Sequence, residues 1–151
     1  MQKKITDTST IISSEGWEEE LQELKRRHEF AANLGGPESV ARQHDAGRLT
    51  IRERISSLAD PDSFQEVGKL TGQGHYVDGK LQGVTPAPYV MGLAQIDARP
   101  VAIGGEDFTV RGGSSWSGDR KKGGQGGFIE DLSLDYRIPL VNLIDGAGGS
   151  V

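Results

Sequence analysis

Glycine is the feature that most constrains how this chain can fold. The 151 residues include 22 glycines, about twice the average usage of roughly 7%. Twelve of them lie within residues 104–151. They show no Gly-X-Y period, which excludes a collagen-like helix, and no Ser/Pro-rich repeat of the kind found in long flexible linkers. The glycines therefore predict turns and loops between the ordered elements of one domain.

Charge and residue content exclude several classes of protein. A net charge of −5, from 17 Lys and Arg against 22 Asp and Glu, argues against non-specific nucleic-acid binding by a basic surface. The absence of cysteine excludes disulfides, a thiolate nucleophile and Cys-based metal sites, and it fits a reducing cytoplasm. No stretch approaches the ~18 apolar residues of a membrane span, and the polar start of the chain differs from a signal sequence. We therefore expect a soluble, untargeted protein.

The first third of the chain has helical patterns. Trp17, Leu21, Leu24, His28 and Ala31 recur at spacings of three and four residues, which predicts one apolar stripe along an amphipathic helix. The opposite face is charged, with acidic residues early and basic residues late, as the helix dipole favours. We expect this helix at the periphery of the domain.

Two further helices follow. Pro37 suits the first position of a helix that reaches about His44. Thr50 and Glu53 form a Ser/Thr-x-x-Glu capping box, which predicts a third helix through Leu58.

Strand patterns occupy the middle of the chain. Residues 64–67 and 107–110 predict short strands, and residues 71–86 predict a loop or an irregular hairpin. Apolar segments on either side of residues 97–100 favour a β-hairpin over 89–103. In the last third, a helix from Phe128 precedes a buried strand that ends near Ile144. This strand, helix, strand order predicts a parallel crossover.

Two common site motifs are missing. Gly118 and Gly123 have the spacing of a Walker A loop, but glycine and glutamine stand at 124–125 where the loop needs Lys-Ser/Thr, so a P-loop is excluded. The serines of residues 114–117 lie in no Gly-x-Ser-x-Gly elbow, which argues against a serine nucleophile of that type.

The histidines do not form a metal motif. His28, His44 and His75 are far apart and lack a His-Glu-x-x-His pattern, so we expect no metal site. We expect His28 on a helix, His44 near a helix end and His75 in a loop.

The glycines near the end of the chain allow two interpretations. Gly148 and Gly149 follow a buried strand, where bare backbone amides can bind an anion or a developing oxyanion. The alternative is that they only permit a sharp turn. Lys121 and Lys122 can contact ligand phosphates, although charge alone favours a solvated loop.

Three segments resemble a known family, the carboxyltransferase (beta) subunits of biotin-dependent acyl-CoA carboxylases. The resemblance covers residues 17–151 in order. The first segment consists of Val40-Ala41-Arg42-Gln43-His44, Gly47-Arg48-Leu49-Thr50-Ile51-Arg52-Glu53-Arg54-Ile55, Leu58, Asp60-Pro61 and Ser63-Phe64. The second is Asp107-Phe108-Thr109-Val110-Arg111-Gly112-Gly113-Ser114. The third is the strand and turn of 139–149.

The resemblance implies an α/β fold of the crotonase (ClpP/crotonase) type, an incomplete superhelix of ββα units preceded by N-terminal helices. It implies carboxyl transfer from carboxybiotin, carried by a biotin carboxylase or biotin carrier partner, to the α-carbon of an acyl-CoA. The enolate formed on the way is held by backbone amides, and the biotin nitrogen serves as the base. This agrees with the absence of cysteine, paired histidines and a serine elbow.

The resemblance also assigns candidate residues. Gly148 and Gly149 would form part of the oxyanion hole, although the turn has one residue more than the family pattern, so a neighbouring amide is an alternative donor. The CoA channel would follow Gly112, Gly113, Ser114 and Ser115, with Lys121 and Lys122 toward the CoA phosphates.

The resemblance further implies how the chain is organised. We expect a disordered segment at 1–14, a helical segment at 15–60 and the first part of a carboxyltransferase domain at 61–151. We expect the chain to be a fragment that is inactive alone, and part of a homo-oligomer at full length, in the cytoplasm or, in a eukaryote, the mitochondrial matrix. Alternatives are a non-catalytic acyl-CoA-binding or assembly fragment and a subunit of a biotin-dependent acyl-CoA decarboxylase.

Overall fold

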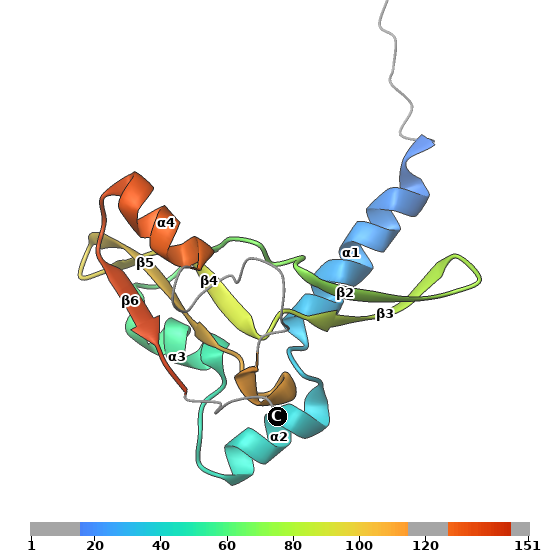
Figure 1. The fold of residues 1–151 in the computed structure, drawn as a ribbon, viewed down its shortest axis with the longest axis horizontal. Helices are drawn as coiled ribbons and strands as arrows, with labels where there is room; N and C mark the ends of the chain where they lie inside the picture. Colours follow the sequence, from blue (N-terminus) through green and yellow to red (C-terminus); the bar gives the residue numbers. More distant parts are fainter. Residues whose placement is uncertain (1–15, 115–126, 146–151) are drawn as a thin grey trace, which may run out of the picture.

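Three helices precede the strands, as their local sequence signals predict. The structure, a computed structural model, describes residues 16–114 and 127–145 (Figure 1). The helices are α1 (Glu18–Ala32), α2 (Pro37–Asp45) and α3 (Ile51–Leu58). Pro37 is the first residue of α2, where its missing amide hydrogen costs nothing. The capping box of α3 is confirmed, because the Thr50 amide donates to Glu53 Oε2 at 2.7 Å and the Glu53 amide to Thr50 Oγ1 at 3.4 Å.

Helix α1 does not pack through its apolar stripe. Of the residues predicted for that stripe, Ala31 is buried, whereas Trp17, Leu21 and Leu24 are exposed. The less exposed positions are instead Glu23, Arg27 and Phe30. The helix therefore contacts the rest of the chain through a mostly polar face.

A four-stranded sheet forms the centre of the fold. Its order is β1-β4-β5-β6, with β1 (Gln65–Glu66), β4 (Tyr89–Ile96), β5 (Arg99–Glu106) and β6 (Leu140–Leu143). The β4–β5 hairpin turns at Asp97 and Ala98, which both have positive φ and whose amides donate to the Asp60 carboxylate at 3.0 and 2.7 Å. Helix α4 (Phe128–Tyr136) connects β5 to the parallel strand β6, so the predicted crossover is confirmed.

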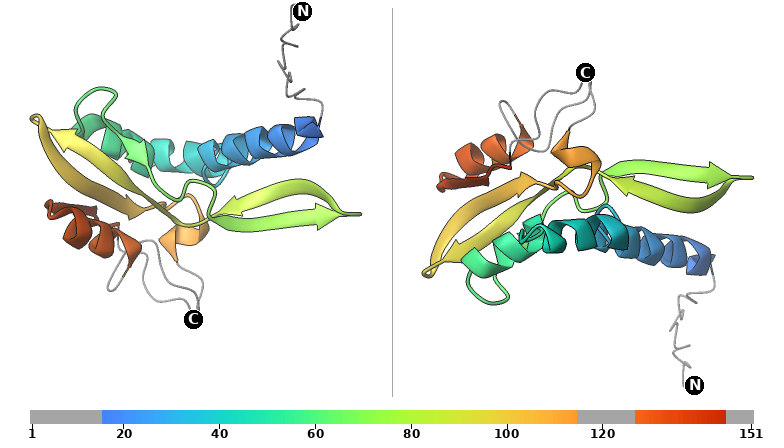
Figure 2. Two further views of the ribbon diagram at one scale, coloured as in Figure 1. Left: turned by 90° about the horizontal axis from the view of Figure 1, so that it is seen from above. Right: turned by 90° about the horizontal axis from the view of Figure 1, so that it is seen from below.

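The sheet is covered on both faces. Figure 2 shows the N-terminal helices on one side and α4 on the other. On the α3 face, the core contains Ile51, Ile55, Val90, Val101 and Ile103. On the α4 face, it contains Tyr89, Met91, Ala102 and Ile129. The alternation along β4 and β5 thus divides their side chains between two small cores.

A second, two-stranded sheet extends beside α1 (Figure 2). It consists of β2 (Gly72–Val77) and β3 (Lys80–Pro86), with a register shift between His75 and Tyr76. Of the two structures predicted for this region, the irregular hairpin is therefore confirmed. The predicted loop position of His75 is wrong, because it lies in β2 and its Nε2 is 2.8 Å from Thr85 Oγ1.

The strand predicted at 107–110 is also wrong. Strand β5 ends at Glu106, and residues 108–110 form a turn. The cause is the Asp107 side chain, which accepts a hydrogen bond from the Thr109 amide at 3.0 Å and so competes with strand pairing. In the described part of the chain, no helix is long and apolar enough to span a bilayer. The segment predicted to be disordered, 1–14, lies outside the described residues.

Candidate active site

The two parallel strands end at the same edge of the sheet. Gly105 of β5 pairs with Leu143 of β6, so the carboxyl ends of these strands lie side by side. Strand β5 leads into the short helix η2 (Arg111–Gly113), and β6 leads toward residues 146–149. Ligands of open α/β sheets bind outside the carboxyl ends of the strands. We call this region the carboxyl edge and take it as the candidate site.

A buried hydrogen-bond network fixes the turn that follows β5. Asp107, which is only 1% exposed, accepts from Thr109 Oγ1 at 2.5 Å as well as from the Thr109 amide. Thr109 Oγ1 in turn accepts from the Gly35 amide at 2.8 Å. Burial raises the pKa of the Asp107 carboxyl, against the opposing effect of the Thr109 hydrogen bonds. The network ties the α1–α2 corner to the carboxyl edge.

Three consecutive left-handed residues then form η2. Arg111, Gly112 and Gly113 have φ values of 53°, 61° and 77°. The Gly113 amide donates to Val110 O at 2.9 Å, and the Ser114 amide donates to Arg111 O at 3.2 Å. The predicted CoA-channel residues 112–114 therefore lie at the carboxyl edge, but two of their amides are already used within the turn.

On the α4 face, a tyrosine reaches across β5 to β6. Tyr89 of β4 is 6% exposed, and its hydroxyl donates to Asn142 Oδ1 at 2.7 Å. The ring crosses β5 over Gly104, where an added Cβ would lie 2.8 Å from Tyr89 Cε1. Burial, and then the carboxylates of Glu106 and Glu130, raise the pKa of the Tyr89 hydroxyl, which keeps it a neutral donor.

The end of β6 and the residues just after it are held from both faces of the sheet. The Asp145 amide donates to Glu106 Oε2 at 3.2 Å on the α4 face. From α3, Arg54 Nη1 donates to Leu143 O at 3.4 Å and lies 3.9 Å from Asp145 Oδ2. These contacts fix the direction in which the chain leaves β6 toward the predicted oxyanion turn.

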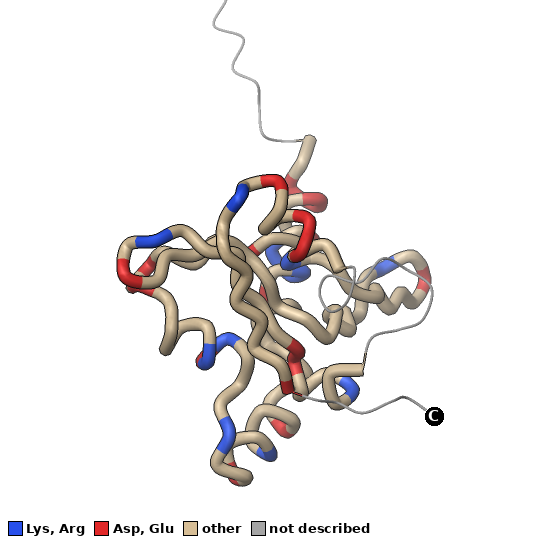
Figure 3. The backbone as a smooth tube through the Cα atoms, turned by 60° about the vertical axis from the view of Figure 1, so that its left-hand side comes forward, with Lys and Arg blue, Asp and Glu red and all other residues tan. Residues whose placement is uncertain are grey.

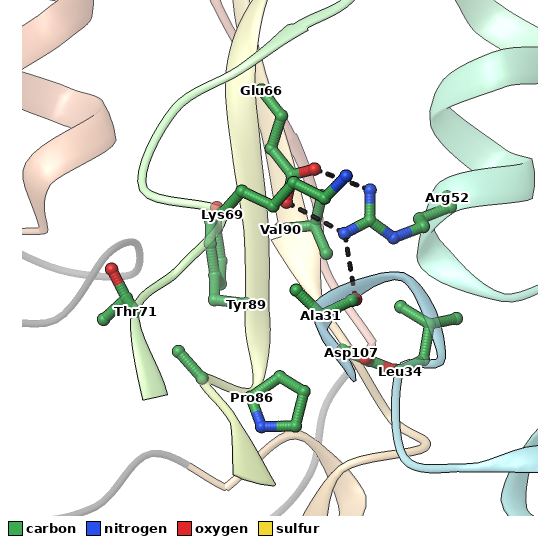
Figure 4. Close-up of a pocket in the computed structure, with 11 residues that line it drawn as sticks. Ala31, Leu34, Arg52, Glu66, Lys69, Thr71, Pro86, Tyr89, Val90 and Asp107 are labelled. Carbon is green, nitrogen blue, oxygen red and sulfur yellow. Dashed lines mark hydrogen bonds and ion pairs between the residues drawn. The ribbon is translucent and has the colours of Figure 1, made fainter. Parts of the chain in front are cut away.

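A small recess beside the start of β4, which Tyr89 and Asp107 also line, has a different character (Figure 4). Its centre is Arg52, which forms two hydrogen bonds to the Glu66 carboxylate, at 2.7 and 2.9 Å, and a third to Ala31 O at 3.3 Å. The guanidinium group thus joins α3, β1 and α1 to one another. Because the charge of this guanidinium group is neutralised within the chain, we interpret the recess as a structural contact between these three elements.

The remaining predicted site residues lie outside the described residues. They are Ser115, Lys121, Lys122, Gly148 and Gly149. Within 16–114 and 127–145, no group of three or more His, Asp or Glu side chains is placed to hold a metal ion.

Sequence reasoning missed the side chains around the carboxyl edge. Tyr89, Glu106, Asn142 and Asp145 carry no motif, and they meet only through the registers of β4 with β5 and of β5 with β6. The one available signal was Tyr89 at the start of an apolar strand, where a buried hydroxyl needs a partner.

The sequence matches one protein family over most of its length. Residues 42–151 match the sequence model of the carboxyl transferase domain. The carboxyltransferase subunit of propionyl-CoA carboxylase from Haloferax mediterranei is 30% identical over 135 residues, which make up 89% of this chain and 26% of that protein. The chain thus spans about a quarter of the length of this relative.

Solved structures with similar folds belong to the same group of enzymes. Transcarboxylase 12S, studied as a hexamer with methylmalonyl-coenzyme A and methylmalonic acid bound, has a TM-score of 0.51 and 35% identity, over 62% of this chain and 18% of that chain. A single-chain, multi-domain long-chain acyl-CoA carboxylase has a TM-score of 0.60 and 28% identity, over 82% of this chain and 13% of that chain. These similarities confirm the fold class expected from the sequence, a crotonase-like α/β fold preceded by N-terminal helices.

Proposed function

Because the chain belongs to the carboxyl transferase domain family, we propose that it supplies the acyl-CoA side of a carboxyl transfer site. The carboxyl group is joined to the α-carbon of an acyl-CoA through an enolate. The observation that carries the proposal is the carboxyl edge itself, where β5 and β6 end side by side. In the sequence, the glycine-rich segments 112–115 and 146–149 follow these two strands, and 118–127 precedes α4.

The main task of this chain is to stabilise the enolate oxygen. We assign that role to the backbone amides of Gly148 and Gly149, which come five and six residues after the end of β6 in the sequence. Amides stabilise a developing negative charge only if they are oriented before the reaction. The contacts of Asn142, Leu143 and Asp145 with Tyr89, Arg54 and Glu106 hold the strand from which this turn departs.

The described side chains at the carboxyl edge fit a reaction whose base comes from the cofactor. Tyr89 is a neutral donor bonded to Asn142, and Glu106 accepts from the Asp145 amide. These groups orient the backbone and leave the α-proton to another base. When bound, carboxybiotin supplies the carboxyl group and that base.

The CoA portion would follow η2. The internal hydrogen bonds of Gly113 and Ser114 leave the Gly112 backbone and the Ser114 hydroxyl as the contacts we propose within the described residues. Ser115, Lys121 and Lys122 extend this proposal toward the CoA phosphates. The methylmalonyl-CoA bound to the related transcarboxylase 12S supports an acyl-CoA as the ligand class.

Several wider assignments belong to the same proposal. They are a biotin carrier or biotin carboxylase partner, a homo-oligomer as in the related hexamer, a cytoplasmic or mitochondrial-matrix location, and the division into segments 1–14, 15–60 and 61–151. Acyl-CoA binding without turnover and biotin-dependent decarboxylation remain the alternative functions, because both use the same acyl-CoA site.

The proposal is tested by titrating the ¹⁵N-labelled chain with propionyl-CoA and, separately, with free CoA. We expect both ligands to shift the amides of 112–115, and propionyl-CoA alone to shift those of 146–149, because only it carries the thioester. A Gly149→Pro variant, which lacks that amide, should lose the shifts at 146–149 with propionyl-CoA and keep the shifts at 112–115 with both ligands. Shifts confined to β2 and β3, or no saturable shifts, would contradict the proposal.

A further inference from the structure

The apolar stripe of α1 is left uncovered by the described chain. Trp17, Leu21 and Leu24 are 66%, 57% and 41% exposed, and His28 is exposed as well. Their spacings of four, three and four residues are those of the a and d positions of a coiled coil. We call these four residues the α1 seam.

The contacts of α1 with its own chain do not use the seam. Arg27 donates to the Glu23 carboxylate at 2.9 Å and to the Tyr76 hydroxyl, and Arg26 donates to Leu81 O at 2.7 Å. These bonds fix α1 against the β2–β3 hairpin. The helix and the hairpin extend together from the four-stranded sheet, which we call the main sheet (Figure 2). The described residues therefore leave the seam uncovered on a helix that is already held in place.

The charges beside the seam are arranged so that α1 complements a second copy of itself that runs in the opposite direction. Acidic residues lie toward the N-terminal end of α1 and basic residues lie further along (Figure 3). With Leu21 and Leu24 as a and d positions, Glu18 and Lys25 occupy e positions on one flank of the seam. In the described part of the chain, neither of these two has an ion-pair partner.

We propose that the α1 seam binds the α1 seam of a second copy of this chain in an antiparallel, two-fold symmetric pair. In this arrangement Leu21 packs against Leu24 of the partner subunit, and Trp17 packs against His28 of the partner subunit. Glu18 then faces Lys25 of the partner subunit, and symmetry repeats each contact. The inference does not depend on the proposed acyl-CoA site.

The charges distinguish this arrangement from a parallel one. In a parallel pair, e positions face g positions of the preceding heptad, so Lys25 would face Glu20 of the partner subunit, but Glu18 would have no basic partner and Trp17 would have to pack against its own copy. An antiparallel pair also places the two main sheets at opposite ends of the paired helices, because each sheet lies at the C-terminal end of its own α1 (Figure 2).

The first test is the dimerisation constant of the chain from sedimentation equilibrium. We expect a reversible monomer–dimer equilibrium, weakened at least roughly tenfold by Leu21→Gln with Leu24→Gln, since two apolar side chains per subunit lose their packing. Leu134→Gln is the matched control, because Leu134 is 75% exposed on α4, away from the seam. A strictly monomeric chain, or equal effects of seam and control variants, would overturn the proposal.

The second test is a charge exchange that probes the direction of pairing. Glu18→Lys and Lys25→Glu should each weaken the dimer, because each brings like charges together across the interface. The double variant should restore the wild-type constant, since the pair is re-formed with its signs reversed. A double variant weaker than both single variants would overturn the antiparallel arrangement. Circular dichroism of each variant checks that α1 is intact.

Discussion

The hydroxyl of Tyr89 on β4 donates to the side chain of Asn142 on β6, so the two residues are joined across the intervening strand β5. The contact is possible because Gly104 of β5 leaves the space that a Cβ would occupy. It connects the antiparallel part of the sheet to the strand that precedes the proposed oxyanion turn.

Replacing Tyr89 by phenylalanine tests this contact. Tyr89→Phe keeps the ring over Gly104 but leaves Asn142 without its donor, so we expect the free energy of unfolding to fall by about 1–2 kcal/mol. The measurement is urea denaturation. Tyr136→Phe is the control, because Tyr136 is 61% exposed; a loss of equal size in both variants would contradict the expectation.

Replacing Gly105 by alanine tests the close approach of β5 and β6. A Cβ at this position would lie 2.3 Å from Leu143 O and 2.6 Å from Ile51 Cδ1. Because the first of these is backbone, the strands must separate, and we expect a loss of about 3 kcal/mol or more. Gly83→Ala is the matched control in β3, since no atom lies within 4 Å of its added Cβ. Comparable unfolding midpoints for the two variants would show that β6 tolerates displacement.

The capping box of α3 predicts a dependence of stability on acid. Hydrogen bonds from His44, and then from Thr50, lower the pKa of Glu53 from 4.5 to about 2. Because the folded state binds this proton less tightly than the unfolded state, the stabilisation is present above pH 4.5 and is lost as the pH falls toward 2. Glu53→Gln should therefore differ most from wild type at neutral pH, and the difference should shrink over this interval. Glu29→Gln, at an exposed position of α1, should show no such convergence.

Asp107 predicts the opposite dependence. Its pKa is raised above the ordinary 3.8, chiefly by burial, so the folded state holds its proton more tightly than the unfolded state. The stabilisation is complete below about pH 3.8 and is lost as the pH rises through the raised value. In Asp107→Asn this loss cannot occur, so the variant should gain stability relative to wild type between pH 3 and 7. A constant difference over that range would contradict the assignment.

Local signals were sufficient to predict most of the helices and hairpins. Pro37, the Thr50–Glu53 capping box and the turn after Ile96 act within a few residues of themselves, and the structure confirms all three. The prediction of a strand at 107–110 was wrong for an equally local reason. A hydropathy pattern does not show that the Asp107 carboxylate accepts a hydrogen bond from the Thr109 amide.

The candidate site was less predictable, because it depends on strand register. Gly112 and its neighbours were predicted through the family resemblance, whereas Glu106 and Asn142 meet Asp145 and Tyr89 only after β6 pairs with β5. The exposed stripe of α1 shows the same limit. Periodicity identified its residues correctly but could not tell which face of the helix would meet the hairpin.

The bond between the Gly35 amide and Thr109 Oγ1 also orders events during synthesis. The two residues are 74 positions apart, and an added Cβ at Gly35 would lie 1.9 Å from Thr109 O, so the corner between α1 and α2 is shaped by a segment made much later. At typical translation rates, that segment emerges roughly 4–15 s after the corner itself. Until that segment emerges, the nascent N-terminal helices lack the contact with Thr109, and the amide of Gly35 is still bound to water.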